Sequence, residues 1–163
     1  MNKFANFVRE LCDVHLNKMP LESVQCLSTA HRFFGHDVGY KASHINHPIN
    51  VWLRESRENY HEMWHYAYSL FMERRRRWPG KPPHKSASVL LSLSRGPKEI
   101  PDVAGTEQPL CMPDQFKIGD VRESYKAYYI HKIQDFHNRG LNTAYTRTLP
   151  PSWLPMYLHN TKN

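Results

Sequence analysis

The sequence predicts an all-α fold, a single compact domain of about five helices with a long central helix and an irregular, Pro-rich C-terminal region. Three observations predict this class. Apolar residues recur at intervals of three and four in several segments, no segment has a convincing strand pattern, and Pro- and Gly-rich stretches separate the helical segments. A chain of 163 residues, 40% hydrophobic and 12% aromatic, is long enough to form one core.

Two helices are expected before Gly35. Apolar residues follow helical spacing over residues 3–19. Pro20 is expected to end this helix, because proline has no amide proton to donate. A second helix is expected over residues 21–34, where Gly35 is a natural stop.

A long helix is expected over residues 48–78, after a polar loop over residues 35–47. Pro48 suits the first turn of such a helix. On a helical wheel, one arc of the helix collects most of its large apolar side chains. This arc predicts a buried face formed by Trp52, Leu53, Tyr60, Met63, Trp64, Ala67, Leu70 and Phe71.

The C-terminal half is expected to hold two further helices. Ser86 suits the N-cap of a short helix that ends near Ser94. Residues 96–119 are rich in Pro and Gly and are expected to be irregular. Asp120 followed by Glu123 resembles a capping box and opens a helix to about residue 138. Residues 139–163 are aromatic and Pro-rich, and we expect an irregular tail.

The charge of the chain favours a polyanionic partner. The net charge is +7 with histidine neutral, which is most often a sign of nucleic-acid binding, although a merely basic protein is the alternative. The three cysteines form no C-x-x-C pair, which favours a reducing compartment. No apolar run approaches the ~20 residues of a membrane span.

Arginine is concentrated at the end of the expected long helix. Arg74, Arg75, Arg76 and Arg77 follow one another, and Trp78, Lys81, His84 and Lys85 come directly after them. Cations at a helix C-terminus are locally favourable, which alone explains their presence. Combined with an aromatic residue and with the net charge, the cluster also predicts a surface that contacts a phosphate backbone.

Two polar residues, Ser56 and Asn59, lie in or beside the apolar arc. A buried polar group without a partner costs about 1–3 kcal/mol. In the first alternative, Ser56 bonds to a carbonyl of its own helix and Asn59 bonds to a carbonyl of a loop. In the second alternative, both side chains line a pocket that the 40–48 loop closes. The second alternative makes them candidate nucleic-acid contacts.

The loop before the long helix carries Lys41, His44 and His47. The two imidazoles are suited to packing, to contacts with phosphates or bases, or to metal binding. Together with Arg54 on the charged side of the helix, these residues are further candidate nucleic-acid contacts.

The sequence motif H-E-x-x-H also occurs, at His61, Glu62 and His65. A zinc site of this type needs both imidazoles in a cleft and a third ligand. On the helical wheel the two imidazoles fall opposite the apolar arc, and no third ligand follows. A solvated charged face explains the motif better, so neither a metal nor another cofactor is expected.

The segment VRELCDVHL, residues 8–16, carries a Glu-Leu, an Asp and a His-Leu at characteristic offsets. It is followed by a loop with Gly39, Tyr40 and Lys41 and by a Pro-started helix with a basic end. In these features about half of the chain resembles the bacteriophage pyrimidine-dimer DNA glycosylases, often called endonuclease V.

This resemblance implies a small, basic, all-α enzyme that extrudes a nucleotide and attacks the sugar C1′ with its N-terminal α-amine. The amine falls on Met1, and Lys41 is a second candidate amine. The carboxylate that stabilises the sugar cation and abstracts a proton in the lyase step falls on Glu22.

A second pattern covers most of the chain. It consists of His47-Pro48, Trp52, Arg54-Glu55-Ser56, Asn59-Tyr60 and Trp64, followed by Met112-Pro113-Asp114 and the tyrosines between residues 125 and 129. This pattern resembles a group of uncharacterised phage proteins. The resemblance implies a phage origin, action in the cytoplasm of the infected host cell, and a role on DNA bases such as thymine hypermodification.

Three functions therefore stay open. The first is a DNA glycosylase and lyase that uses an amine and Glu22. The second is a base-modifying transferase, such as an amino acid:DNA transferase, with its chemistry around His44, His47, Ser56 and Asn59. The third is a DNA-binding or host-inhibiting protein without catalysis.

Overall fold

The computed structural model describes residues 5–159, and within this range it contains α-helices and short 3-10 turns but no strand. The α-helices are α1 (Ala5–Arg9), α2 (Asp13–Phe33), α3 (Pro48–Glu55), α4 (Arg57–Arg77), α5 (Ala87–Ser92) and α6 (Val121–Asn138). Two 3-10 turns, η1 (Asp114–Phe116) and η2 (Met156–Leu158), complete them. The all-α prediction is confirmed.

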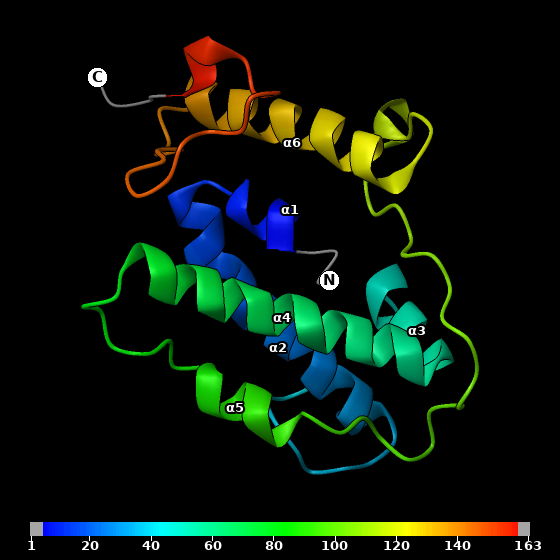
Figure 1. The fold of residues 1–163 in the computed structure, drawn as a ribbon. Helices are drawn as coiled ribbons and strands as arrows, with labels where there is room; N and C mark the ends of the chain where they lie inside the picture. Colours follow the sequence, from blue (N-terminus) through cyan, green and yellow to red (C-terminus); the bar gives the residue numbers. More distant parts are fainter. Residues whose placement is uncertain (1–4, 160–163) are drawn as a thin grey trace.

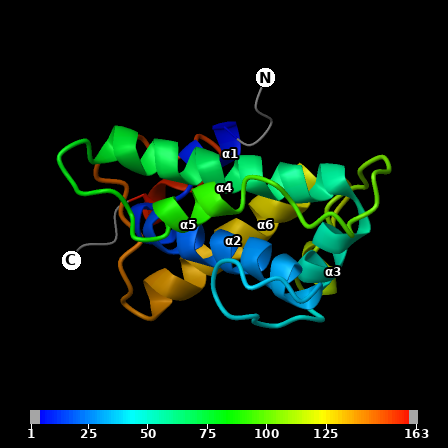
Figure 2. The ribbon, with the colours of Figure 1, turned by 90° about the horizontal axis from the view of Figure 1, so that it is seen from below.

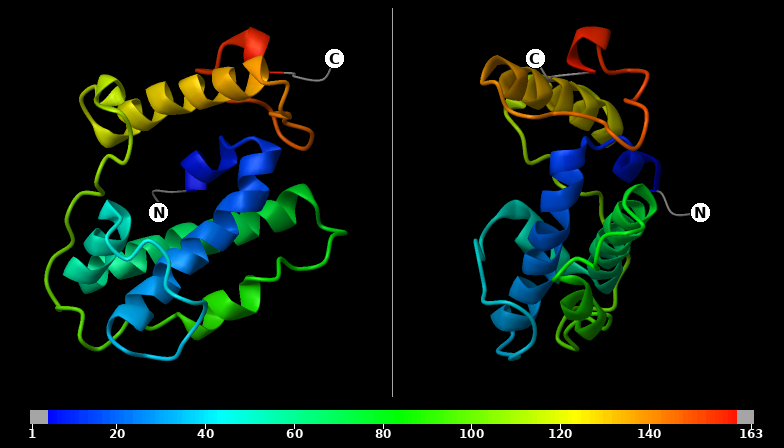
Figure 3. Two further views of the ribbon diagram at one scale, coloured as in Figure 1. Left: turned by 180° about the vertical axis from the view of Figure 1, so that it is seen from behind. Right: turned by 90° about the vertical axis from the view of Figure 1, so that its left-hand side faces the viewer.

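The long helices α2 and α4 cross and pack against each other at the centre (Figure 1). α3 contacts one end of both, and α5 packs against α4. Seen from below, α5 lies nearest the viewer and α6 lies behind α2 (Figure 2). The views from behind and from the side place α1 between the α2–α4 pair and α6 (Figure 3). The molecule is therefore layered, with α6 as the outermost helix on one side.

Two clusters of buried side chains hold these layers together. The larger cluster lies where α2, α3, α4 and α5 meet, and it includes Leu27, Leu53 and Tyr60. The second cluster joins α1 and the start of α2 to α6 and the C-terminal segment, and it includes Leu16 and Ile133. Burial of apolar surface is the main favourable term in both.

The prediction that Pro20 ends a helix is wrong. Pro20 is buried within the continuous helix α2. A proline inside a helix removes one hydrogen bond, to the carbonyl four residues earlier. Here Leu16 and Val24 on either side are fully buried, and the burial that a continuous helix gives them offsets this loss. The chain breaks earlier instead, over residues 10–12, between α1 and α2.

The predicted long helix is two helices, because Ser56 interrupts it. The backbone of Ser56 is extended, with φ −151° and ψ 142°. Its hydroxyl accepts the amide proton of Glu58 at 3.1 Å, as an N-cap does. The same hydroxyl donates to the carbonyl of Val103 at 2.7 Å. The predicted apolar face holds for most members, but Trp64 and Phe71 are only partly buried.

The predicted C-terminal elements are largely confirmed. The Asp120 carboxylate accepts the amide proton of Glu123 at 2.9 Å and caps α6. α5 forms where it was expected, but the Ser86 hydroxyl does not cap it and bonds to the Tyr40 hydroxyl at 3.0 Å instead.

The region after α6 is irregular apart from η2, as predicted for residues 139–163, of which 160–163 lie outside the described residues. It is nevertheless built into the fold, because Tyr145, Leu154 and Leu158 are buried in the second cluster. No helix in the described part of the chain is long and apolar enough to cross a membrane.

Candidate functional site

A groove of about 650 Å³ opens between α2 and α6, and α1, α3, α4 and residues 106–111 contribute to its walls. This volume is typical of sites for small molecules. Its aromatic lining includes Phe7, Trp52, Tyr66, Tyr125, Tyr128 and Tyr129. Its polar lining includes His15, Glu22, His47, Glu62, Glu107, Gln108, Arg122 and Lys132. Aromatic rings can stack on a planar ligand, and the titratable side chains among them can bond to polar atoms at the edge of such a ligand.

Glu22, the predicted catalytic carboxylate, lines this groove. It lies in the third turn of α2, past the helix N-terminus. Its side chain is 43% exposed and pairs with Lys18 at 3.1 Å, one turn earlier. Met1, the predicted nucleophile, lies outside the described residues.

His47 also lines the groove, whereas its neighbours in the loop do not. His47 is the N-cap of α3, and its Nδ1 accepts the amide proton of Ile49 at 3.3 Å. His44 and Lys41 are exposed, and neither is among the residues that line the groove. The Asn50 side chain holds this loop by donating to the carbonyls of Ser43 and His44. The structure thus places His47 and Glu22 in the wall of the same groove, which Lys41 does not line.

Ser56 and Asn59 do not line the groove. Asn59 is fully buried, donates to the carbonyl of Trp52 at 2.9 Å and accepts the amide proton of Thr106 at 2.9 Å. Ser56 bonds to Val103, as described above. Both side chains fasten residues 103–106 to the junction of α3 and α4, so the interpretation of them as nucleic-acid contacts is corrected to a structural role.

The arginine cluster divides into structural and exposed members. The Arg77 side chain is 0% exposed, so it does not belong to the predicted phosphate-binding surface. Arg74 donates to the Asn17 side chain at 3.1 Å and to the carbonyl of Pro82. Arg76 makes two hydrogen bonds of 2.7 Å to Glu73. Arg75 is exposed and belongs to the solvent-facing part of the cluster.

Of the other residues predicted to contact nucleic acid near the cluster, two interact with neighbouring residues of the chain. Lys81 is exposed and lies over the ring of Trp78, 4.8 Å from its centroid. Lys85 is exposed. The Nδ1 of His84 accepts the amide proton of Ser86 at 3.1 Å. The exposed cations available to a phosphate backbone here are therefore fewer than the sequence suggests.

Arg54 is held in place rather than free in solvent. Its guanidinium lies 3.9 Å from the centroid of the Phe33 ring, and it donates to the carbonyl of Ile45 at 2.7 Å. Burial lowers the pKa of Arg54, against the opposing charge of Glu55. Since the pKa of arginine lies so far above 7, the group stays charged. Its packing braces the loop before α3.

The H-E-x-x-H residues do not gather as metal ligands. His65 is exposed and His61 is half-buried. Glu62 lines the groove, whereas the two histidines do not. Among residues 5–159, no three His, Cys, Asp or Glu side chains lie close enough together to hold a metal ion.

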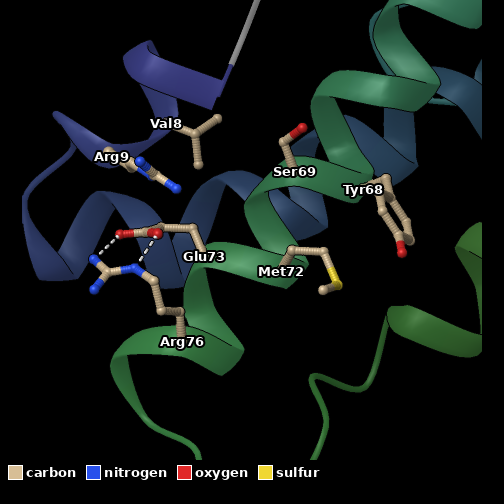
Figure 4. Close-up of a pocket in the computed structure, with 7 residues that line it drawn as sticks. All are labelled: Val8, Arg9, Tyr68, Ser69, Met72, Glu73 and Arg76. Atoms are coloured by element: carbon tan, nitrogen blue, oxygen red, sulfur yellow. Dashed lines mark hydrogen bonds and ion pairs between the residues drawn. The ribbon is translucent and has the colours of Figure 1, made fainter. Parts of the chain in front are cut away.

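A smaller cavity of about 370 Å³ lies between α1 and α4 (Figure 4). Val8 and Arg9 from α1 face Tyr68, Ser69, Met72, Glu73 and Arg76 from α4. Burial alone would raise the pKa of Glu73, but the hydrogen bonds and charges of Arg76 and Arg77 together lower it. The ion-paired Glu73 closes one side of this cavity, which the sequence did not indicate.

The thiols near the groove are poor nucleophiles. Burial raises the pKa of Cys26 to about 11, and burial also raises the pKa values of Cys12 and Cys111. Because the thiolate is the reactive form, these groups are unreactive near neutral pH.

A buried histidine, His15, also lines the groove. From the sequence it was named only as part of the segment over residues 8–16, with no role. The Nδ1 of His15 lies 2.8 Å from the hydroxyl of Tyr129 on α6. Burial, with smaller contributions from Lys132 and Lys18, lowers the pKa of His15 to about 4. The signal available in the sequence was its spacing from Glu22, seven residues later on the same helix.

This pKa predicts a loss of stability in acid. Between about pH 6.5 and 4 the unfolded chain binds a proton at His15 that the folded protein does not bind. The free energy of unfolding should therefore fall as the pH falls through this window, by up to about 1.4 kcal/mol per unit. Urea unfolding at pH 7, 6 and 5 measures it, and His15→Gln should flatten the dependence. An unchanged slope in that variant would contradict the prediction.

Comparison of the chain with protein-family models, with curated proteins and with solved structures finds no match. The resemblance to the phage glycosylases therefore stays a prediction from the sequence.

Proposed function

We propose that the protein acts on a base of DNA, which it extrudes from the stack into the groove between α2 and α6. The observation that carries this proposal is the presence of Glu22 and His47 in one aromatic-walled groove of about 650 Å³, in a chain of net charge +7. Enzymes that act on bases take the target nucleotide into a pocket and hold it between aromatic or apolar side chains.

The first candidate chemistry is that of a DNA glycosylase and lyase. In such a reaction an amine attacks C1′ and forms a Schiff base, and a carboxylate stabilises the cation and assists elimination. Glu22 lines the groove, which supports this role for its carboxylate. The N-terminal α-amine is the proposed nucleophile, since Lys41 is exposed and is not among the residues that line the groove.

A base-modifying transferase is the second candidate, and two observations favour it. Of the four residues around which this alternative places its chemistry, His47 lines the groove together with Glu22, whereas His44, Ser56 and Asn59 do not. The groove is also more spacious than one planar base requires, so it has room for a second reactant. In this case Glu22 and His47 would move protons while a group is transferred to the base.

Borohydride trapping separates the two chemistries. We expect Glu22→Gln to bind DNA as the wild type does but to lose most strand cleavage, because only the carboxylate is removed. A borohydride-stable adduct with abasic DNA supports the lyase, and Lys41→Gln serves as the control that should leave the adduct unchanged. If no adduct forms while phage DNA bases are altered in a Glu22-dependent way, the lyase fails and the transferase is favoured.

DNA binding itself is expected to depend on the exposed cations rather than on the whole arginine run. Replacing Arg75, Lys81 and Lys85 with glutamine should weaken binding and reduce the slope of log K against log salt by roughly one for each lost phosphate contact. Fluorescence anisotropy over a salt series measures both quantities.

A control variant with the same change of charge replaces Lys98, Lys117 and Arg139, which are exposed elsewhere on the chain. Equal effects of the two triple variants would show that net charge, and not this surface, attracts the DNA. No binding at about 50 mM salt by the wild type would contradict the nucleic-acid function.

A further inference from the structure

His15 and Tyr129 form a hydrogen-bonded pair in the wall of the groove. His15 lies in the first turn of α2 and is only 8% exposed, and Tyr129 reaches it from α6. Their Nδ1 and hydroxyl atoms are 2.8 Å apart. The backbone amide of Cys12 donates to the same hydroxyl oxygen at 2.9 Å. Both side chains also line the groove, so the pair faces whatever binds there.

The hydrogen bonds favour one position for the proton of His15. The Tyr129 oxygen accepts from Cys12, and a buried hydroxyl must also donate its own proton to avoid a large loss of free energy. The Nδ1 of His15 lies 2.8 Å from this hydroxyl and can accept that proton. A neutral imidazole that accepts at Nδ1 carries its proton at Nε2.

The environment also keeps this ring uncharged near neutral pH. Burial and the neighbouring Lys132 and Lys18 hold the pKa of His15 well below its ordinary value. An imidazolium would attract a phosphate or a carboxylate. A neutral ring with a proton at Nε2 is suited instead to an uncharged acceptor, such as a carbonyl oxygen.

We infer that His15 presents a neutral Nε2–H to the groove and donates it to a carbonyl oxygen of the bound base, with Tyr129 as the residue that fixes this tautomer. The inference rests on the proposed function for the identity of the ligand. Thymine, uracil, cytosine and guanine carry such an oxygen, and adenine does not. The groove therefore selects oxo-bearing bases and rejects adenine.

The tautomer is tested without DNA. Nitrogen–proton NMR of the histidine side chains should show His15 protonated at Nε2 alone from pH 8 down to pH 5. Tyr129→Phe removes the proton donor to Nδ1, so the proportion of the Nδ1–H tautomer should rise in this variant. A proton at Nδ1 in the wild type, or titration of His15 near pH 6.5, would overturn the inference whatever the protein binds.

The ligand is tested with short duplexes in which one target nucleotide faces an abasic site, because an unpaired base is extruded easily. The wild type should bind a thymine target about tenfold more tightly than an adenine target. His15→Phe should keep general DNA binding and lose this preference, whereas His15→Gln retains an amide donor and should retain part of it. Circular dichroism checks that each variant is folded.

The outcomes separate the two proposals. If the wild type binds no DNA, the proposed function fails, and the NMR measurement still decides what His15 presents to the groove. If the wild type binds but His15→Phe keeps the preference for thymine, the role of His15 is wrong while the proposed function stands. Equal binding of thymine and adenine by the wild type also overturns the inference.

Discussion

Replacing Arg77 with methionine is expected to destabilise the protein by about 3–5 kcal/mol, the range for breaking a buried ion pair by removing one partner. The Arg77 side chain is fully buried and pairs with Glu73 at 2.8 Å and with Asp13 at 3.1 Å. It also donates to the carbonyls of Arg9, the last residue of α1, and Leu11. Methionine leaves these carbonyls without this donor and removes the cation beside Asp13, while Glu73 keeps only its pair with Arg76.

Chemical denaturation at pH 7 measures this effect. Arg75→Met serves as the control, because Arg75 is the exposed neighbour in the same helical turn and should change stability by less than about 0.5 kcal/mol. Similar losses in the two variants would show that helix propensity, and not the buried network, explains the effect. Retained stability in Arg77→Met would contradict the role assigned to the network.

Asn59→Leu is the second substitution with a large expected effect. The Asn59 side chain joins the end of α3 to the segment over residues 103–106, through Trp52 and Thr106. Leucine leaves the buried Trp52 carbonyl without this partner and removes the acceptor of the partly buried Thr106 amide. At about 1–3 kcal/mol for the buried carbonyl and about 1 kcal/mol for the bond to Thr106, the loss should be about 2–4 kcal/mol.

Urea unfolding measures the change, and limited proteolysis reports where the chain loosens. Thr106→Val is the matched control, because it removes only the side-chain bond at 3.1 Å and leaves both backbone partners of Asn59 in place. It should cost about 1 kcal/mol. If Asn59→Leu costs no more than this control, the two backbone bonds do not stabilise the fold as argued.

Elements governed by local chemistry were predictable from the sequence. The cap of α6 depends on Asp120 and Glu123 alone, which are three residues apart, and it forms as expected. The helical class follows from the spacing of apolar residues, most of which are buried as predicted. Of the candidate site, Glu22 and His47 were found by resemblance and by position, and both line the groove.

Elements that depend on distant partners were not predictable. At Pro20 an expected helix end is absent, and at Ser56 an unexpected helix break is present. Pro20 carries a strong local signal for a helix end, and burial on both sides overrides it. Ser56 lies within a helical pattern, and the break there is favoured by its bond to Val103, 47 residues away. In each case the deciding interaction involves tertiary packing that local spacing does not encode.

The sequence by itself determined the helical class and the basic charge, because these follow from composition and from local spacing. It named Glu22 through a resemblance and His47 through its place before the helix that begins at Pro48. Only the tertiary structure decided that Arg77 is a buried ion-pairing residue and that Asn59 fastens a distant segment. It also decided that His15 meets Tyr129, 114 residues later, in the wall of the groove. The physical reason is that burial and pairing with remote groups set the role of a polar side chain, and both arise only when the helices pack.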